Sequence, residues 1–220
     1  MGRRNPPAAA LRKPLRFVVT AGPTREHIDP VRFISNPSTG KMGFAVAAAA
    51  AAAGHETALV AGPCALKTPR GVERIDVVSA RDMQKAVKSL EGPDAILVAT
   101  AAVADWRPAK RAAKKLRKSE IGGVIRLARN PDVLKSAKFP LKVGFAAQTH
   151  DVVAEAVRKC REKRLAFVVA NDVTEKGCGF GTDTNRVTIV RADGSAKSLP
   201  MASKAAVARR IVRECENLRA

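Results

Sequence analysis

The sequence predicts an α/β protein with a Rossmann-like, doubly wound, mostly parallel sheet, and three observations lead to this fold class. Short apolar runs alternate with segments of helical spacing along the chain. One run, 95–99, is apolar throughout, which is typical of a strand buried at the centre of a parallel sheet. Near the C-terminus, Asp193-Gly194 separates two strand-like runs, which predicts an antiparallel hairpin extension of the sheet.

Each element is expected from its own pattern, taken in order. The first strand is 15–20, and an alanine-rich helix follows near 41–54. Further strands are expected at 56–61, 72–78, 95–99, 142–147, 165–170, 186–190 and 197–200, with an edge strand at 124–127. Helices are expected at 80–90, at 151–164 and after the N-cap Ser203.

The length of 220 residues fits one domain, expected over 15–220, behind a basic tail of residues 1–14 that we expect to be disordered. The tail lacks the apolar core of a secretory signal, and no run is long enough to cross a bilayer. The four cysteines are widely spaced and show no zinc pattern. Reduced thiols in a cytoplasmic protein with no membrane partner are therefore expected.

The formal net charge is +20, and such a field attracts nucleic acid, anionic lipid or phosphorylated metabolites. Aromatic residues are only 4% of the chain, with one Trp and no Tyr. That composition argues against a stacking platform for single-stranded nucleic acid. A basic nucleic-acid-binding protein therefore stays an alternative, but a disfavoured one.

The connection between the first strand and the first helix, residues 21–40, is the most informative segment. Strand-to-helix connections usually take a handful of residues, and one of about twenty is normally functional or disordered. It ends in Ser38-Thr39-Gly40 at a helix start, where free backbone N–H groups favour an anion. Gly43 in the first turn fits either this anion site or close helix–strand packing.

Two common nucleotide motifs are absent after the first strand. The dinucleotide fingerprint G-x-G-x-x-G is missing, because only Gly22 follows the strand. The P-loop is missing too, since Met42 stands where Ser or Thr is required. An NAD(P)-dependent reductase on the same fold is therefore a disfavoured alternative.

Several polar residues admit two interpretations from the sequence alone. Asp105 follows the central strand and could accept from ribose hydroxyls, hold a divalent cation or cap a helix. Lys159 and Lys163 share a helix face, which is either a binding face or an exposed basic surface. The basic segment near 107–122 is either a flexible lid over a polyphosphate or a solvated loop, and Asn36 is an ordinary turn asparagine unless a substrate lies beside it.

Six blocks of the chain, in order, resemble phosphopantothenate–cysteine ligase (phosphopantothenoylcysteine synthetase) of the bacterial, CTP-using type. The first is the whole of 21–40, and the others are 101–106 (AAVADW), 115–118 (KLRK), 130–132 (NPD), 144–149 (GFAAQT) and 170–173 (ANDV). Three positions depart from the family pattern. Thr39 stands where Ser is usual, Arg117 where Lys is usual, and Gln148 where Glu is usual.

The resemblance implies an activity. A ligase of this type joins 4′-phosphopantothenate to L-cysteine in coenzyme A biosynthesis. The pantothenate carboxylate attacks the α-phosphorus of CTP and pyrophosphate leaves. The cysteine amine then attacks the acyl-cytidylate, and CMP departs. Mg²⁺ or Mn²⁺ is the implied metal, a homodimer is the implied assembly, and the flavin-dependent decarboxylase of many relatives is expected on a separate chain.

The resemblance also assigns roles to residues. Asn36 and Lys115 are the implied catalytic residues, and Asp105 is the implied metal ligand. The implied substrate-binding residues are Arg32, Ser38, Thr39, Gly40 and Gly43. The implied nucleotide-binding residues are Ala99, Thr100, Ala101, Asp105, Lys115, Pro131, Asp132, Val133, Leu134, Phe145, Lys159 and Lys163.

Overall fold

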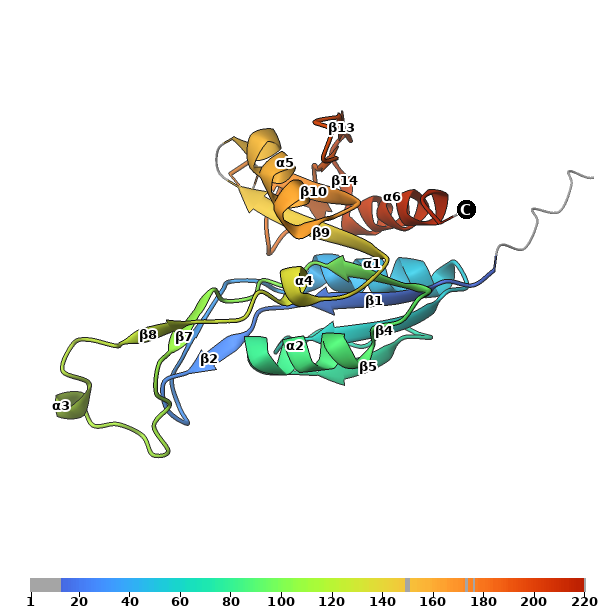
Figure 1. Ribbon diagram of the computed structural model, residues 1–220. Coiled ribbons are helices and arrows are strands. Elements are labelled where there is room, and N and C mark those ends of the chain that lie inside the picture. Colours follow the sequence, from blue (N-terminus) through green and yellow to red (C-terminus); the bar gives the residue numbers. More distant parts are fainter. Residues whose placement is uncertain (1–12, 149–150, 173, 176, 220) are drawn as a thin grey trace, which may run out of the picture.

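The computed structural model describes residues 13–148, 151–172, 174–175 and 177–219, so most of the predicted tail and the side chain of Gln148 lie outside the described residues. A central sheet has the strand order β13-β12-β10-β9-β6-β1-β4-β5 (Figure 1). Its strands are β1 (Arg16–Ala21), β4 (Glu56–Ala61), β5 (Glu73–Asp76), β6 (Ala95–Ala99), β9 (Leu141–Gln148), β10 (Phe167–Asp172), β12 (Thr188–Val190) and β13 (Ala196–Ser198).

The pairing confirms the predicted fold class. The strands from β5 to β10 in this order are parallel, whereas β12 pairs antiparallel with both β10 and β13. Gly194 turns the chain between β12 and β13 with a φ of 92°, a value that glycine adopts without strain. The sheet is thus Rossmann-like and mostly parallel, with the antiparallel hairpin that Asp193-Gly194 predicts.

Helices cover both faces of the sheet, because successive strand residues point to opposite sides. Phe17 and Val19 of β1 are buried in one core with α1 (Lys41–Ala52) and α6 (Lys204–Asn217). Val18 lies in the opposite core, which involves three other helices. These are α2 (Ala80–Ser89), α4 (Val133–Ser136) and α5 (Val152–Lys163). Ser203 caps α6 as predicted, since its side chain accepts from the amide of Ala206 at 3.2 Å.

The strand order reverses at β1, and this positions the site. From β1 the chain passes through α1 to β4 on one side, and it later returns to β6 on the other side. The connections leaving β1 and β6 therefore diverge at their carboxyl ends, which opens a crevice at that edge. Gly43 lets α1 begin directly against this edge. A Cβ at Gly43 would lie 2.5 Å from the Cβ of Ala21 and 2.4 Å from Oγ1 of Thr100.

An arm extends from the carboxyl edge of the sheet (Figure 1). It contains the hairpin β2 (Arg25–His27) with β3 (Phe33–Ser35), and the pair β7 (Trp106–Pro108) with β8 (Leu127–Arg129). The short helix α3 (Lys118–Ile121) lies within the segment that joins β7 to β8, at the outer tip of the arm (Figure 1). The prediction that 21–40 is an irregular connection is therefore wrong in part, and the predicted edge strand at 124–127 lies too early. Strands of three residues are too short to give a periodic signal.

Smaller differences concern the ends of elements. The first helix ends at Ala52, two residues earlier than predicted, and α4 and the pair β11 (Thr184–Asn185) with β14 (Ala202–Ser203) were not predicted. Within the described part of the chain, no helix is long and apolar enough to cross a membrane.

Candidate functional site

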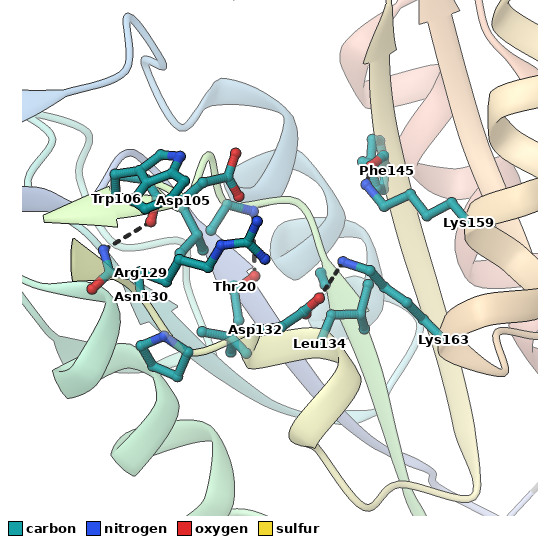
Figure 2. Close-up of a pocket in the computed structure, with 16 residues that line it drawn as sticks. Thr20, Asp105, Trp106, Arg129, Asn130, Asp132, Leu134, Phe145, Lys159 and Lys163 are labelled. Carbon is teal, nitrogen blue, oxygen red and sulfur yellow. Dashed lines mark hydrogen bonds and ion pairs between the residues drawn. The ribbon is translucent and has the colours of Figure 1, made fainter. Parts of the chain in front are cut away.

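Two cavities lie next to each other at the carboxyl edge of the sheet. The first has a volume of about 460 Å³, and Figure 2 shows its lining. It is lined by Thr20, Ala99, Ala101, Val103, Ala104, Asp105, Trp106, Arg129, Asn130, Pro131, Asp132, Val133, Leu134, Phe145, Lys159 and Lys163. Asp105, Phe145, Lys159, Ala101 and Val103 also line the second cavity, so a molecule in one can meet a molecule in the other.

Lys159 is the most perturbed cation of the first cavity. Its ammonium donates to the carbonyl of Phe145 on β9, and both residues lie on one wall in Figure 2. Burial, together with the positive charge of Lys163, lowers the pKa of Lys159 to about 8. An ammonium in this state gains most from an anionic ligand, because the ligand's charge replaces the lost hydration.

Lys163 is held by Asp132 on the opposite side of the cavity. Its Nζ lies 2.8 Å from Oδ2 of Asp132, as Figure 2 shows. The other carboxylate oxygen of Asp132 accepts from the amide of Lys135 at 2.9 Å and caps α4. Desolvation raises the pKa of Asp132, but the Lys163 ammonium and the Lys135 amide outweigh it, so this pKa is below its usual range.

The outer wall comes from the β7–β8 pair. The guanidinium of Arg129 lies 5.2 Å from the ring centroid of Trp106, and both side chains are exposed. Asn130 fixes this wall, since its side-chain amide donates to the carbonyl of Ala104 at 2.8 Å. Its backbone amide donates to the carbonyl of Asp105 at 2.8 Å. The Asp105 carboxylate therefore projects from a backbone held on both sides.

The second cavity, of about 290 Å³, lies where α1 begins. It is lined by Ser38, Gly40, Met42, Gly43, Thr100, Ala101, Ala102, Val103, Asp105, Phe145, Ala147, Lys159, Asn171, Gly179, Phe180, Asn185 and Lys204. Gly40 is the N-cap of α1 with a φ of 80°; it makes no side-chain cap hydrogen bond, and the first turn holds no acid. This helix start therefore presents its positive end to the cavity.

A loop over 177–185 covers this helix start. The Thr39 hydroxyl donates to the carbonyl of Phe180, and Lys41 donates to the carbonyl of Gly181 at 2.8 Å. Lys41 also pairs with Asp183 at 2.7 Å. Two residues of the predicted helix-start segment thus hold the loop in place.

Arg32 and Asn36 do not line either cavity. Each instead donates a hydrogen bond to a backbone carbonyl group. Arg32 pairs with the buried carboxylate of Asp29 and donates to the carbonyl of Leu116 at 2.9 Å. The amide of Leu116 donates back to Asp29 at 3.2 Å. These bonds, led by that from Arg32, hold the pKa of Asp29 well below its usual range. Asn36 donates from Nδ2 to the carbonyl of Ala102 at 3.1 Å.

Lys115 is exposed on the basic segment and lines neither cavity. Its neighbour Leu116 is bonded through both backbone groups to Asp29 and Arg32, as described above. The segment is thus tied to the β2–β3 hairpin directly beside Lys115. The role of Lys115 stays a prediction.

The structure brings most of the predicted nucleotide-binding residues together in the first cavity. They are Ala99, Ala101, Asp105, Pro131, Asp132, Val133, Leu134, Phe145, Lys159 and Lys163. Ser38, Gly40, Gly43 and Thr100 line the second cavity. Arg32, Asn36, Thr39 and Lys115 are outside both linings. Polar lining residues to which the sequence reasoning gave no role in the site are Thr20, Arg129, Asn130, Asn171, Asn185 and Lys204.

The carboxylates at the two cavities fit a metal ion that is held mainly by the phosphates of a nucleotide. Within the described residues, no three His, Cys, Asp or Glu side chains gather into a site that could hold a metal alone. Asp105 presents an exposed carboxylate that both cavities share. Mg²⁺ is commonly held by one or two carboxylates together with substrate phosphates and water. Asp105 can therefore supply one ligand and a phosphorylated molecule the others.

Residues 13–218 match the model of the DNA/pantothenate metabolism flavoprotein C-terminal domain. The chain belongs to this family. It is 44% identical over 216 residues to the coenzyme A biosynthesis bifunctional protein CoaBC of Vibrio vulnificus, covering 94% of this chain and 54% of that protein. It is 46% identical over 202 residues to CoaBC of Bacillus subtilis, covering 90% of this chain and 50% of that protein.

The fold of this chain is also similar to a solved structure from the same family. The C-terminal domain of a CoaBC protein superposes with a TM-score of 0.80 and 40% sequence identity, covering 96% of this chain and 98% of that one. The chain thus spans about half the length of the curated relatives and nearly all of that C-terminal domain.

Proposed function

We propose that this chain joins 4′-phosphopantothenate to L-cysteine, with CTP as the activating nucleotide, and forms 4′-phosphopantothenoylcysteine for coenzyme A synthesis. The observation that carries the proposal is the pair of adjoining cavities. One contains several cations, the other lies at a helix start without a side-chain cap, and they share Asp105 and Lys159. Two anionic substrates can thus meet end to end.

The first cavity is the proposed nucleotide site. Lys159 and Lys163 offer charge to phosphates from α5, and Lys115 approaches from the basic segment when that segment closes as a lid. Ala99 and Ala101 leave room for a base close to the strand ends. The match of Lys115–Lys118 to the CTP-using branch supports CTP in preference to ATP.

The second cavity is the proposed site of the acyl substrate. Its phosphate would lie at the start of α1, among Ser38, Gly40 and Gly43. The carboxylate at the other end of the molecule would then reach the boundary with the first cavity. In this proposal Thr39 holds the loop over 177–185 next to the substrate, and Arg32 holds the basic segment there.

The reaction would proceed in two displacements. The carboxylate attacks the α-phosphorus of CTP, pyrophosphate leaves, and an acyl-cytidylate forms. The cysteine amine then attacks the acyl carbon, CMP leaves with the electron pair of the broken C–O bond, and the nitrogen loses a proton to solvent as the amide forms. A divalent cation, with Asp105 as its protein ligand, would supply charge neutralisation for the triphosphate. The Asn36 amide is the proposed donor to the acyl oxygen during the second step.

The proposal extends to assembly. Several large apolar side chains are exposed on the arm, and they include Val31, Phe33, Val124, Ile125 and Leu127. An exposed apolar patch of this kind is typical of a protein–protein interface. It supports a homodimer through the arm. The cytoplasmic location stays a prediction from the widely spaced cysteines.

The reductase alternative finds no support at the crevice. The residues after β1 are bound to the segment after β6, since the amide of Thr24 donates to the carbonyl of Ala102 at 3.3 Å and the amide of Ala102 donates to the carbonyl of Gly22 at 2.9 Å. A dinucleotide would require a glycine-rich turn with free amides at this place.

The test is pyrophosphate release from each nucleotide with 4′-phosphopantothenate, L-cysteine and Mg²⁺. Release should require CTP, the acid and the metal. Equal turnover with ATP would overturn the nucleotide assignment. NADH oxidation coupled to a carbonyl substrate, without pyrophosphate release, would overturn the ligase proposal.

A further inference from the structure

Asp29 is a buried carboxylate to which the proposed reaction assigns no role. Its side chain has no exposed surface, it lies in the turn between β2 and β3, and it lines neither of the two cavities. Burying a carboxylate costs free energy unless charged and hydrogen-bonding partners replace its hydration. Asp29 has such partners on both oxygens, and they belong to two different parts of the arm.

The two carboxylate oxygens of Asp29 bind different groups. Oδ1 accepts from the backbone amides of Val31 at 2.9 Å and of Arg32 at 2.8 Å, and so closes the turn of its own hairpin. Oδ2 accepts from the Arg32 guanidinium, with Nε at 2.9 Å, and from the amide of Leu116 at 3.2 Å. Leu116 lies on the basic segment near 107–122, so Oδ2 is the oxygen that links the hairpin to that segment.

Two further bonds fix the same stretch of the basic segment. Arg32 donates to the carbonyl of Leu116 at 2.9 Å, so both backbone groups of Leu116 are bound. The amide of Ala112 donates to the carbonyl of Ile28 at 2.9 Å. Lys115 therefore lies on a short stretch between two attached residues, directly next to Leu116. The hairpin sets its backbone position, although its side chain is exposed.

The charge of Asp29 strengthens this attachment. The Arg32 guanidinium, together with the backbone amides, holds the pKa of Asp29 well below its usual range. The carboxylate is therefore ionised at neutral pH and neutralises the charge of Arg32. Replacing it by a neutral group would weaken the bonds to the guanidinium and to the Leu116 amide, because bonds to an ionised acceptor are the stronger ones.

We propose that Asp29 is a positioning residue for the proposed reaction: it holds the backbone of Leu116 so that the adjoining Lys115 presents its ammonium to the triphosphate of the nucleotide. This inference rests on the proposed function. Asp29 touches no substrate and takes part in no bond change, so it acts through the placement of Lys115. The attachment reduces the conformational freedom that the segment loses when Lys115 binds a phosphate.

The first test compares Asp29→Asn with wild type. Asparagine is uncharged and has one acceptor oxygen, so it cannot close the turn and also bind Arg32 and Leu116. Single-turnover pyrophosphate release at saturating CTP should slow about tenfold, because a charge-assisted hydrogen bond that places Lys115 is lost. Asp29→Ser is a second variant with the same expected result, since its hydroxyl can close the turn but is too short to hold Leu116.

The matched control is Glu26→Met on the same hairpin. Glu26 is 3% exposed, and its carboxylate accepts from the amide of Ala80 at 2.9 Å. Methionine leaves that buried amide without its acceptor, so the melting temperature should fall at least as far as in Asp29→Asn. The rate of pyrophosphate release should stay at the wild-type value, which separates the placement of Lys115 from a general weakening of the hairpin.

A second comparison shows whether Asp29 acts through Lys115. Lys115→Gln already lacks the ammonium, so adding Asp29→Asn to it should slow pyrophosphate release by less than twofold. A tenfold slowing in both backgrounds overturns the inference. A higher KM for 4′-phosphopantothenate at an unchanged rate, kept in the Lys115→Gln background, also overturns it, because Asp29 would then position Arg32 alone.

Limited digestion with trypsin tests the attachment without any measurement of activity. Trypsin cleaves the bond between Lys115 and Leu116, and the N–H of that bond is the group that Asp29 binds. Cleavage there should be about five- to tenfold faster in Asp29→Asn than in wild type or Glu26→Met. Equal cleavage in all three proteins overturns the inference. Absence of pyrophosphate release in wild type defeats the proposed function instead, and the digestion then still decides whether Asp29 holds the segment.

Discussion

The two cavities differ in how they use charge. In the first, Lys159 is half-buried with a pKa lowered to about 8 and donates to one carbonyl, so a bound anion would stabilise its charged form. In the second, Lys41 and Lys204 are bound to loop groups, and the cavity itself offers a helix start and a neutral amide. The comparison indicates that the first cavity binds through lysine side chains, each held by one protein contact, and the second through the backbone of a helix start.

Removing the charge of Lys159 should have the largest effect. We expect Lys159→Met to lower kcat/KM for CTP by about two to three orders of magnitude, since a preorganised charge contact in a closed site is lost. Steady-state kinetics at several CTP concentrations measure this. Arg161→Met on the same helix is the control, because Arg161 is exposed and contacts the carbonyl of Ala192. A loss below fivefold would show that Lys159 serves only to bind Phe145.

Lys115→Gln should have the next largest effect, and it should lower the rate of pyrophosphate release. Loss of one charge-assisted phosphate contact at closure is expected to slow pyrophosphate release by about two orders of magnitude. Stopped-flow measurement of the burst checks this, with Lys114→Gln as the neighbouring control. If both variants release pyrophosphate at the wild-type rate, the basic segment is a solvated loop.

Asn36→Asp should separate the two chemical steps. The change removes an amide donor and adds a negative charge beside the acyl oxygen, so transfer to cysteine should slow about tenfold or more. Activation at phosphorus is farther away and should suffer less. Mass spectrometry after an acid quench should then detect acyl-cytidylate. Equal loss of both steps together with a lower melting temperature would show that Asn36 only binds the carbonyl of Ala102.

The pH dependence should also differ between the cavities. Lys159 is charged below its pKa of about 8 and neutral above it, and a polyphosphate binds the charged form. The KM for CTP should therefore be flat below pH 8 and should rise by up to about tenfold per pH unit above it. Lys159→Met should remove this rise. The half-saturation by 4′-phosphopantothenate should not follow the same curve, and a common curve would contradict the division of charge.

Thr39→Val should give the smallest effect. It removes the hydrogen bond to the carbonyl of Phe180 and should lower the free energy of unfolding by about 1 kcal/mol. The KM for 4′-phosphopantothenate should rise a few-fold, and that for CTP should not. Thr39→Ser keeps the hydroxyl and should resemble wild type in denaturant unfolding and kinetics. An equal change in both KM values would mean that the loop over 177–185 supports both cavities.

The sheet and the first cavity could be predicted largely from the sequence, and there are physical reasons for this. Runs such as 95–99 are apolar throughout because both faces of the sheet are covered. Asp132, Phe145 and Lys159 were identified through the family resemblance, since their spacing alone does not show that they meet. The structure adds that Lys159 is bound to Phe145 and that Lys163 pairs with Asp132.

The arm and the second cavity could not be predicted in the same way. The strands of the arm have three residues each, too few for a period. Asn185 and Lys204 meet the start of α1 only through long-range packing, across more than a hundred residues. Arg129 precedes the block 130–132 by one residue, and this proximity was the sequence signal that could have identified it. The structure places it opposite Trp106 in the β7–β8 pair.

The depressed pKa of Lys159 also has a chemical consequence. At pH 8 about half of the Lys159 side chains carry a free amine, whereas a lysine with an ordinary pKa is neutral in roughly 0.4% of molecules. Acylating and reductive-alkylation reagents react with the neutral amine, so at limiting dose they should label this position far ahead of the surface lysines. Peptide mapping would then report occupancy of the cavity directly, because any anion that holds Lys159 in its charged form protects it from the label.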